Sequence, residues 1–316
     1  PMKEAIEAMK KAYASFSDGM AVAPLRMRLS IPDSDALSLF MPAYVRTGDS
    51  EALAIKAVSL FPSNPARGLA YIQAAVLVFD PQTGQAIALL EGSSLTAIRT
   101  GAASGASIDL LARRDSKVVA IFGAGAQGRT QLQAACAARD IESAFVFDSD
   151  VDRANAFAEE MAGQDRIPRD IRVAASPKEA IEYADIICTA TTSSTPVFDG
   201  RDVKPGTHIS AVGAYTPDMC EIPPETVLRA RVFVDSRSAC MEEAGDLIQP
   251  IRAGLFDESH IHAELGEVIL GRKSGRETND EITFFKSVGL AVQDLYAASR
   301  AYENAVRLGL GRELDR

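Results

Sequence analysis

The spacing of apolar residues divides the first third of the chain into one helix and a series of strands. Between residues 2 and 16, apolar side chains recur every three or four positions, which predicts an amphipathic helix: Met2, Ile6, Met9, Tyr13 and Phe16. From about residue 24 to 91 the pattern changes to short β-like runs separated by turn sequences. The predicted strands are Arg26–Ile31, Leu37–Met41, Leu53–Leu60, Ile72–Phe79 and Ala86–Leu90. These runs predict a mainly antiparallel sheet.

Strands and helices alternate through the rest of the chain. Residues 94–113 predict a helix rich in small residues, which suits close packing against another element. Over 117–235 the repeated βα units predict a parallel, doubly wound sheet, and a long helical pattern follows from Glu281 to Leu308. We therefore expect an α/β protein with a Rossmann domain over 113–284. A mixed, mainly antiparallel α/β domain is expected over 1–112 and 285–316.

The first strand of the expected Rossmann domain runs into a glycine-rich turn. Residues 117–128 have the sequence K-V-V-A-I-F-G-A-G-A-Q-G, the G-x-G-x-x-G pattern of dinucleotide-binding units. Gly123 permits a tight turn, Gly125 lets the backbone approach a pyrophosphate, and Gly128 lets helix and strand pack closely. The next strand ends at Asp148, 20 residues later (148 − 128), at the spacing of a ribose-binding acid. Together these features predict a nicotinamide dinucleotide site, with an ordinary βαβ turn and a surface aspartate as the alternative.

The overall charge bears on the partners of the protein. The formal net charge of −10 disfavours nucleic acid or an anionic membrane as a partner, although placed arginines can still attract an anionic small molecule. No apolar run approaches the roughly 20 residues of a membrane span, and no secretory signal pattern is present. The chain starts at Pro1 inside a predicted helix, so we expect that some native N-terminus precedes it.

The cysteines and histidines predict neither disulfides nor a metal site. His260 and His262 alternate as in a strand, but no third ligand has suitable spacing, and His208 opens an apolar strand as a core histidine would. The cysteines are widely spaced without a C-x-x-C pair, which favours a reduced, cytoplasmic protein: Cys136, Cys188, Cys220 and Cys240.

Three cationic side chains are candidates for chemistry. Lys56 lies in mid-strand among apolar neighbours, so it either snorkels at a wet edge or serves a cleft. Arg28 alternates with polar neighbours, for which a solvated strand face is the simpler interpretation. Arg99 lies in the small-residue helix, where it could enter an interdomain cleft and bind a carboxylate with two hydrogen bonds. No general-base histidine stands out. Lys56 is therefore the best candidate for proton transfer, because burial readily lowers a lysine pKa towards neutrality.

Segments along nearly the whole chain resemble the ornithine cyclodeaminase/μ-crystallin family. The matching segments are Met41–Tyr44, Lys56, Leu95–Ala102, Gly123–Gly128, Ala211–Ala214, Pro217–Glu221, Val234–Ser236, Glu264–Ile269 and Phe285–Leu290. The resemblance implies a homodimer that pairs through the first domain. It also implies that substrate and nicotinamide meet in a cleft between the two domains.

The resemblance also implies roles for individual residues. Arg28, Lys56 and Arg99 match the family's carboxylate-binding and proton-handling positions. The positions implied for cofactor binding are Thr100, Gly123, Gly125, Ala126, Gln127, Gly128, Asp148, Arg153, Thr191, Thr192, Val212, Gly213, Ser287 and Gly289. Among these, the residues that would line the nicotinamide half of the cofactor are Thr191, Thr192, Val212, Gly213, Ser287 and Gly289. Asp148 favours NAD by repelling a 2′-phosphate, whereas nearby Arg153 leaves NADP open.

Two departures from the family pattern bear on the reaction. Members that release ammonia from ornithine carry acids where this chain has Leu39 and Tyr215, so reduction of a small cyclic imino acid is the favoured activity. Asp218 could replace a missing acid if its loop shifts, which keeps an ornithine or lysine cyclodeaminase as the alternative. An alanine-type dehydrogenase and a cofactor-loaded binding protein without turnover are the further alternatives.

Overall fold

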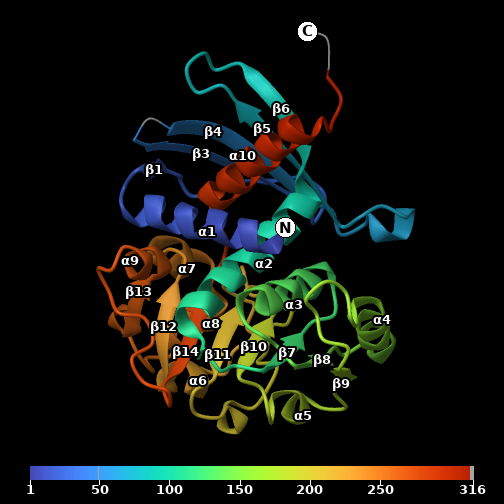
Figure 1. Ribbon diagram of the computed structural model, residues 1–316, viewed down its shortest axis with the longest axis vertical. Coiled ribbons are helices and arrows are strands. Elements are labelled where there is room, and N and C mark those ends of the chain that lie inside the picture. The colour runs from blue at the N-terminus through green and yellow to red at the C-terminus, as the bar shows by residue number, and fades with distance from the viewer. Residues whose placement is uncertain (49, 314–316) are drawn as a thin grey trace.

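The computed structural model describes residues 1–48 and 50–313, which form two β-sheets with helices between and around them (Figure 1). The first sheet has the order β1-β3-β4-β5-β6, with β2 paired to β3, and all its pairings are antiparallel. Its strands are β1 Ala21–Val22, β2 Met27–Ser30, β3 Leu37–Thr47, β4 Ser50–Leu60, β5 Ile72–Phe79 and β6 Ala86–Glu91. The predicted antiparallel sheet is confirmed, with β3 extending six residues beyond its predicted end at Met41.

Three helices lie against or below this sheet and connect it to the rest of the molecule (Figure 1). They are α1 Met2–Ser17, α2 Gly92–Leu111 and α10 Ala291–Leu308. Leu295 of α10 is fully buried against the sheet, in one cluster with Met41 and Val76. The small residues of α2 allow very close packing, because a Cβ at Gly101 would lie 2.5 Å from the Thr130 carbonyl oxygen.

The second sheet is entirely parallel and has the order β13-β12-β14-β11-β10-β7-β8-β9. Its strands are β7 Val118–Phe122, β8 Ser143–Phe147, β9 Ile171–Val173, β10 Ile186–Thr189, β11 His208–Ala211, β12 Ala230–Val234, β13 Ile261–Glu264 and β14 Ile282–Lys286. Its helices are α3 Ala126–Ala138, α4 Val151–Met161, α5 Pro177–Ile181, α6 Pro224–Arg229, α7 Arg237–Glu243, α8 Gly245–Arg252 and α9 Leu265–Ile269, with 3₁₀ turns η2 Gly200–Asp202 and η3 Glu258–His260. A further 3₁₀ turn, η1 Pro65–Arg67, lies between β4 and β5 of the first sheet. The chain runs outward from β7 to β9 and then returns to β10 on the other side of β7. Ligands of open α/β sheets bind at such a switch point, outside the carboxyl ends of the strands.

The prediction of one long helix from Glu281 to Leu308 is wrong in its first part. Ile282–Lys286 form β14, which pairs with β12 and β11 inside the parallel sheet. All five residues of this strand are buried, including the polar Thr283 and Lys286, so the period-two alternation of a half-buried strand is missing. The strand ends in a loop with Gly289 at φ +86°, and only then does α10 begin. The boundary expected at residue 285 therefore falls within a strand of the parallel sheet.

Candidate active site

The turn after β7 has the geometry that a dinucleotide requires. Gly123 has φ +97°, and a Cβ at Gly128 would lie 2.0 Å from the Gly123 carbonyl oxygen, so both positions need glycine within the protein itself. A Cβ at Gly125 would meet no protein atom within 4 Å. Gly125 also caps α3, whose first amides receive no side-chain cap, with Ala126 and Gln127 forming the first turn. The open side of Gly125 and the free helix N-terminus fit the pyrophosphate of a dinucleotide.

Asp148 lies at the end of β8, next to this turn. Its Oδ2 accepts a hydrogen bond of 2.8 Å from the Ala124 amide, and its Oδ1 accepts one of 2.9 Å from the Asp150 amide. Arg153 is more than half exposed, and its Nη1 lies 4.0 Å from Asp148 Oδ2. The backbone thus orients the carboxylate, and an arginine that could meet a 2′-phosphate stands beside it.

Three further loops leave the carboxyl ends of neighbouring strands. Thr191 follows β10, Gly213 follows β11, and both donate to the buried carboxylate of Glu221. After β14, the Ser287 hydroxyl and the Gly289 amide donate to Asp235 Oδ2 at 2.7 and 2.8 Å. The structure therefore brings the residues predicted for the nicotinamide half to one edge of the sheet: Thr191, Thr192, Val212, Gly213, Ser287 and Gly289.

A buried charged cluster of Lys56, Asp294 and Arg99 joins three elements near this edge. Lys56 of β4 lies 2.6 Å (Nζ to Oδ2) from Asp294 of α10, and Arg99 Nε of α2 donates to Asp294 Oδ1 at 2.9 Å. All three residues are buried: Lys56 is 2% exposed, Asp294 1% and Arg99 7%. Burial lowers the pKa of Lys56 to about 7, with Asp294 opposing and Arg99 adding to the decrease. Burial alone would raise the pKa of Asp294, but the charges of Arg99 and Lys56 outweigh it and lower this pKa. The carboxylate therefore stays ionised between the two cations. A lysine that titrates near neutrality is suited to proton transfer.

The cluster is tied to the loop after β14. A Cβ at Gly289 would lie 2.7 Å from Arg99 Nη1, so this glycine lets the loop pass directly over the guanidinium. Gln293 accepts from Arg99 Nη1 at 3.3 Å and from the Leu290 amide at 2.6 Å, and donates to the Tyr13 hydroxyl at 2.8 Å. The loop expected at the nicotinamide and the cluster expected at the substrate are therefore neighbours.

In the part of the chain that the structure describes, no hydrogen bond or ion pair joins the remaining predicted site residues to the charged cluster or to the Asp235 and Glu221 carboxylates. Arg28 is exposed on β2, and Arg26, two residues earlier, reaches inward: its Nη2 donates to the Val288 and Gly289 carbonyl oxygens at 2.9 and 2.6 Å. Asp218 is exposed in the loop between β11 and α6. Thr100 is buried on α2, next to Arg99 in sequence. The site roles of Arg28, Asp218 and Thr100 stay predictions, as do those of the other predicted site residues.

Sequence reasoning missed Asp294, Gln293 and Arg26. A signal existed for the first two, because both are polar residues in the first turn of an amphipathic helix and lie on its buried side. No sequence signal pointed to Arg26, because strand alternation places it on the same face as Arg28 and does not show which of the two side chains reaches inward.

The histidines are held by protein groups. His208 is buried between the Ser107 and Thr283 hydroxyls, 3.1 and 2.9 Å from its ring nitrogens, as a core histidine. His260 lies in η3 and not in a strand, with Nε2 2.8 Å from the Val227 carbonyl oxygen, whereas His262 is in β13. Within the described ranges, no group of three or more histidine, cysteine or acidic side chains is arranged to bind a metal ion.

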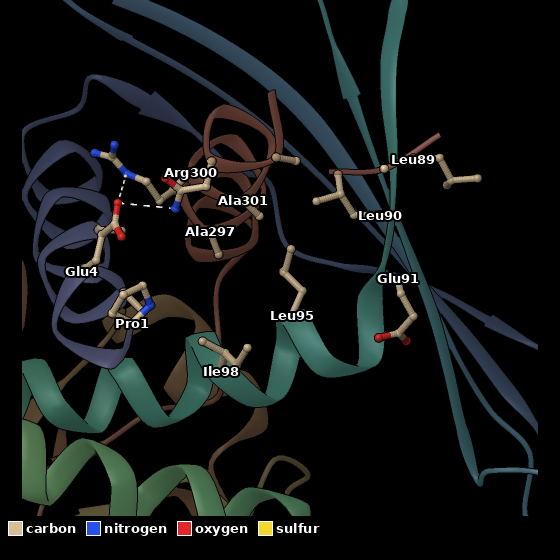
Figure 2. Close-up of a pocket in the computed structure, with 15 residues that line it drawn as sticks. Pro1, Glu4, Leu89, Leu90, Glu91, Leu95, Ile98, Ala297, Arg300 and Ala301 are labelled. Carbon is tan, nitrogen blue, oxygen red and sulfur yellow. Dashed lines mark hydrogen bonds and ion pairs between the residues drawn. The ribbon is translucent and has the colours of Figure 1, made fainter. Parts of the chain in front are cut away.

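A separate apolar pocket of about 470 Å³ lies among α1, α2, β6 and α10 (Figure 2). It is lined by Leu90, Leu95 and Ile98, with the ion pair of Glu4 and Arg300 at one side. Neither the charged cluster nor the glycine turn contributes to its lining.

Among the described residues, no helix is long and apolar enough to cross a membrane.

The two-sheet fold and these sites are those of a dinucleotide-dependent oxidoreductase. A model of the ornithine cyclodeaminase/mu-crystallin family matches residues 1–308, and the chain belongs to this family. A Delta(1)-pyrroline-2-carboxylate reductase of Bacillus cereus is 42% identical over 315 residues, which cover 99% of this chain and 95% of the relative.

Solved structures of other proteins share this fold over nearly the whole chain. The Thermococcus litoralis Delta(1)-pyrroline-2-carboxylate reductase, in complex with NADH and L-proline, superposes with a TM-score of 0.94 at 46% identity, covering 99% of this chain and 96% of that one. An archaeal alanine dehydrogenase dimer with bound NAD has a TM-score of 0.91 at 32% identity, covering 100% of this chain and 95% of that one.

Proposed function

We propose that this protein reduces a small cyclic imino acid of the pyrroline-2-carboxylate or piperideine-2-carboxylate type to the L-amino acid, with NADH as reductant. The observation that carries the proposal is the buried Lys56–Asp294–Arg99 cluster beside the nicotinamide loops. The full-length similarity to pyrroline-2-carboxylate reductases supports it.

The charged cluster supplies the two functions that imine reduction needs from a protein. Arg99 keeps hydrogen-bond donors beyond its bonds to Asp294 and Gln293, and its guanidinium suits a carboxylate geometrically. Lys56, with a pKa near 7, holds a proton for the imine nitrogen, which gains that proton as the adjacent carbon gains hydride. The bound nicotinamide supplies the hydride. Asp294 orients both cations and offsets part of their charge in a buried site.

NAD is the proposed cofactor over NADP because Asp148 follows β8 at the spacing of a ribose-binding acid, where its charge would repel a 2′-phosphate. In this proposal the parallel-sheet domain binds the cofactor, and the antiparallel domain together with α10 binds the substrate. The antiparallel domain and α10 also form the homodimer. The dimeric state of the archaeal alanine dehydrogenase supports the homodimer. The four free, buried cysteines agree with a cytoplasmic protein.

The missing acids bear on the cyclodeaminase alternative. Leu39 is buried on β3 opposite Arg28, and Tyr215 is half-buried with its pKa raised by burial and by Tyr71. Neither position offers a carboxylate for a second amino group, so we favour the reductase.

The test is to follow NADH oxidation by the purified protein with each cyclic imino acid and to identify the product. We expect turnover and formation of L-proline or L-pipecolate. Ornithine with catalytic NAD is the parallel arm. Release of ammonia from ornithine, without oxidation of NADH by either imine, would overturn the proposal in favour of a cyclodeaminase.

A further inference from the structure

Three ionisable side chains lie fully buried below the nicotinamide loops, outside the chemistry proposed above. Lys286, Asp246 and Glu221 are each 0% exposed. Lys286 Nζ lies 2.8 Å from Asp246 Oδ2, and Asp246 Oδ1 accepts from the Glu221 amide at 2.6 Å and the Ile222 amide at 3.0 Å. This buried chain links the end of β14 through α8 to the loop before α6.

The Glu221 carboxylate bridges two loops. Its Oε1 accepts from the Thr191 amide at 2.6 Å and from the Thr191 hydroxyl at 2.8 Å, and its Oε2 accepts from the Gly213 and Ala214 amides at 2.7 and 3.2 Å. Thr191 and Gly213 follow β10 and β11, which are paired up to Thr189 and Ala211. Glu221 therefore fixes the two adjacent strand ends relative to each other.

The fit leaves no room for adjustment at Gly213. A Cβ there would lie 2.2 Å from the Thr191 carbonyl oxygen and 2.4 Å from Glu221 Oε1. The two loops and the carboxylate are thus in van der Waals contact as well as hydrogen-bonded, so displacement of one displaces the others.

The charges explain why a carboxylate is used at this position. Four donors converge on Glu221, and only an ionised carboxylate accepts at every site without presenting a donor of its own. Burial raises the pKa of Glu221, and the Lys286 ammonium and the Thr191 donors oppose that rise. Despite its own burial, Lys286 has a raised pKa because Asp246 and Glu221 stabilise its charge. Buried charges are tolerated when they are paired in this way.

We propose that Glu221, tied through Asp246 to Lys286, is a positioning residue that holds the Thr191 and Gly213 loops in the shape that receives the nicotinamide end of the cofactor. The inference rests on NAD(H) being the cofactor of the proposed function, but not on which imino acid is reduced. The adenine half is held elsewhere, at the glycine turn and Asp148. Loss of the Glu221 carboxylate should therefore weaken binding of the nicotinamide half of the cofactor and leave binding of the adenine half unchanged.

The test uses Glu221→Gln in the full-length protein and compares the dissociation constants of NADH and ADP-ribose by calorimetry. The glutamine side chain has an NH₂ group in place of one carboxylate oxygen, and this donor would face backbone N–H groups that are donors themselves. The variant therefore loses its hydrogen bonds to one of the two loops. We expect NADH to bind about tenfold more weakly, as for the loss of one strong buried hydrogen bond, while ADP-ribose binding changes less than about twofold. The matched control is Glu182→Gln, an exposed glutamate in the same domain, for which neither constant should move.

Hydrogen exchange without cofactor provides a second readout. In the variant, the amides of Thr191, Gly213 and Ala214 should exchange faster, while those of Ile187 and Ile209 in the strands should not change. If Glu221→Gln fails to fold, Glu221→Asp keeps the charge but is too short to bridge both loops, and the same selective loss is expected. Equal weakening of NADH and ADP-ribose, or unchanged NADH affinity, would overturn the proposal. Neither result depends on whether any imine is reduced, so failure of the proposed function remains distinguishable.

Discussion

The glycine turn after β7 takes all its residues from one short stretch, whereas the charged cluster takes each member from a different element. Gly123, Gly125 and Gly128 lie within six consecutive residues between a strand and a helix. In contrast, Asp294 lies 195 residues from Arg99, and Lys56 comes from strand β4 of the antiparallel sheet. The turn depends on local backbone geometry, while the cluster depends on the packing of α2, α10 and the antiparallel sheet. Substitutions should therefore act locally on cofactor binding in the first region and on turnover in the second.

Lys56→Met should produce the largest effect. Methionine fills a similar volume without a proton to donate, and general acid catalysis typically contributes about 10² to 10⁴ in rate. We expect kcat to fall by that factor while the dissociation constant of NADH stays the same, because the glycine turn is untouched. Steady-state kinetics and NADH titration check this directly. Normal turnover would remove Lys56 from the chemistry.

Arg99→Ala should act mainly on substrate binding. Removal of a charge-assisted hydrogen bond costs about 1.5–3 kcal/mol, so we expect KM for the imino acid to rise by about tenfold to a hundredfold. Arg99→Lys is the control that keeps the charge but loses the planar fork. Arg28→Ala, measured in parallel, decides whether the exposed arginine belongs to the clamp. A KM for Arg99→Ala that matches the wild type would exclude Arg99 from it.

Titration of Lys56 should appear in the pH dependence. Its pKa near 7 is lowered by burial, so the protonated donor is present below about pH 7 and is lost as the pH rises. We expect kcat/KM to fall about tenfold per pH unit above that value. Lys56→Arg stays protonated throughout, and its activity, although lower, should not show this decrease. The comparison cancels titration of the substrate itself, so identical profiles for the two proteins would contradict the assignment.

How much of each region could be predicted follows from the same difference. The glycine turn and Asp148 were identifiable because glycine spacing and the distance to the acid are properties of one βαβ unit. Lys56 and Arg99 stood out only as charges among apolar or small neighbours, and nothing in the sequence showed that Asp294 joins them. Strand alternation gave Arg26 and Arg28 the same face, but the depth of each side chain depends on packing. The strand β14 was mistaken for helix because a strand that is buried on both faces, as here with Thr283 and Lys286 among its residues, lacks the period-two alternation.

Gly125→Ala should weaken cofactor binding without affecting the fold. Its added Cβ meets no protein atom within 4 Å and would occupy the space of the pyrophosphate, so we expect NADH affinity to fall about tenfold at an unchanged melting temperature. Gly128→Ala is the contrasting variant, since its Cβ would lie 2.0 Å from the Gly123 carbonyl oxygen and should destabilise the protein itself. Thermal unfolding without cofactor separates the two. Equal destabilisation by both substitutions would mean that Gly125 serves the fold and not a ligand.

Asp148→Ser should give the smallest effect, a change in cofactor preference. A hydrogen bond to the ribose is worth about 0.5–1.5 kcal/mol, so NADH should bind about threefold to tenfold more weakly. NADPH should bind more tightly as repulsion of its 2′-phosphate is removed and Arg153 becomes available. Because Asp148 also accepts from the Ala124 amide, Asp148→Asn is the control that keeps an acceptor for the turn while removing the charge. Binding of AMP and of adenosine 2′,5′-bisphosphate isolates the ribose from the nicotinamide half. An unmoved preference between these two nucleotides would show that the acid only orders the turn, and that cofactor choice is made elsewhere.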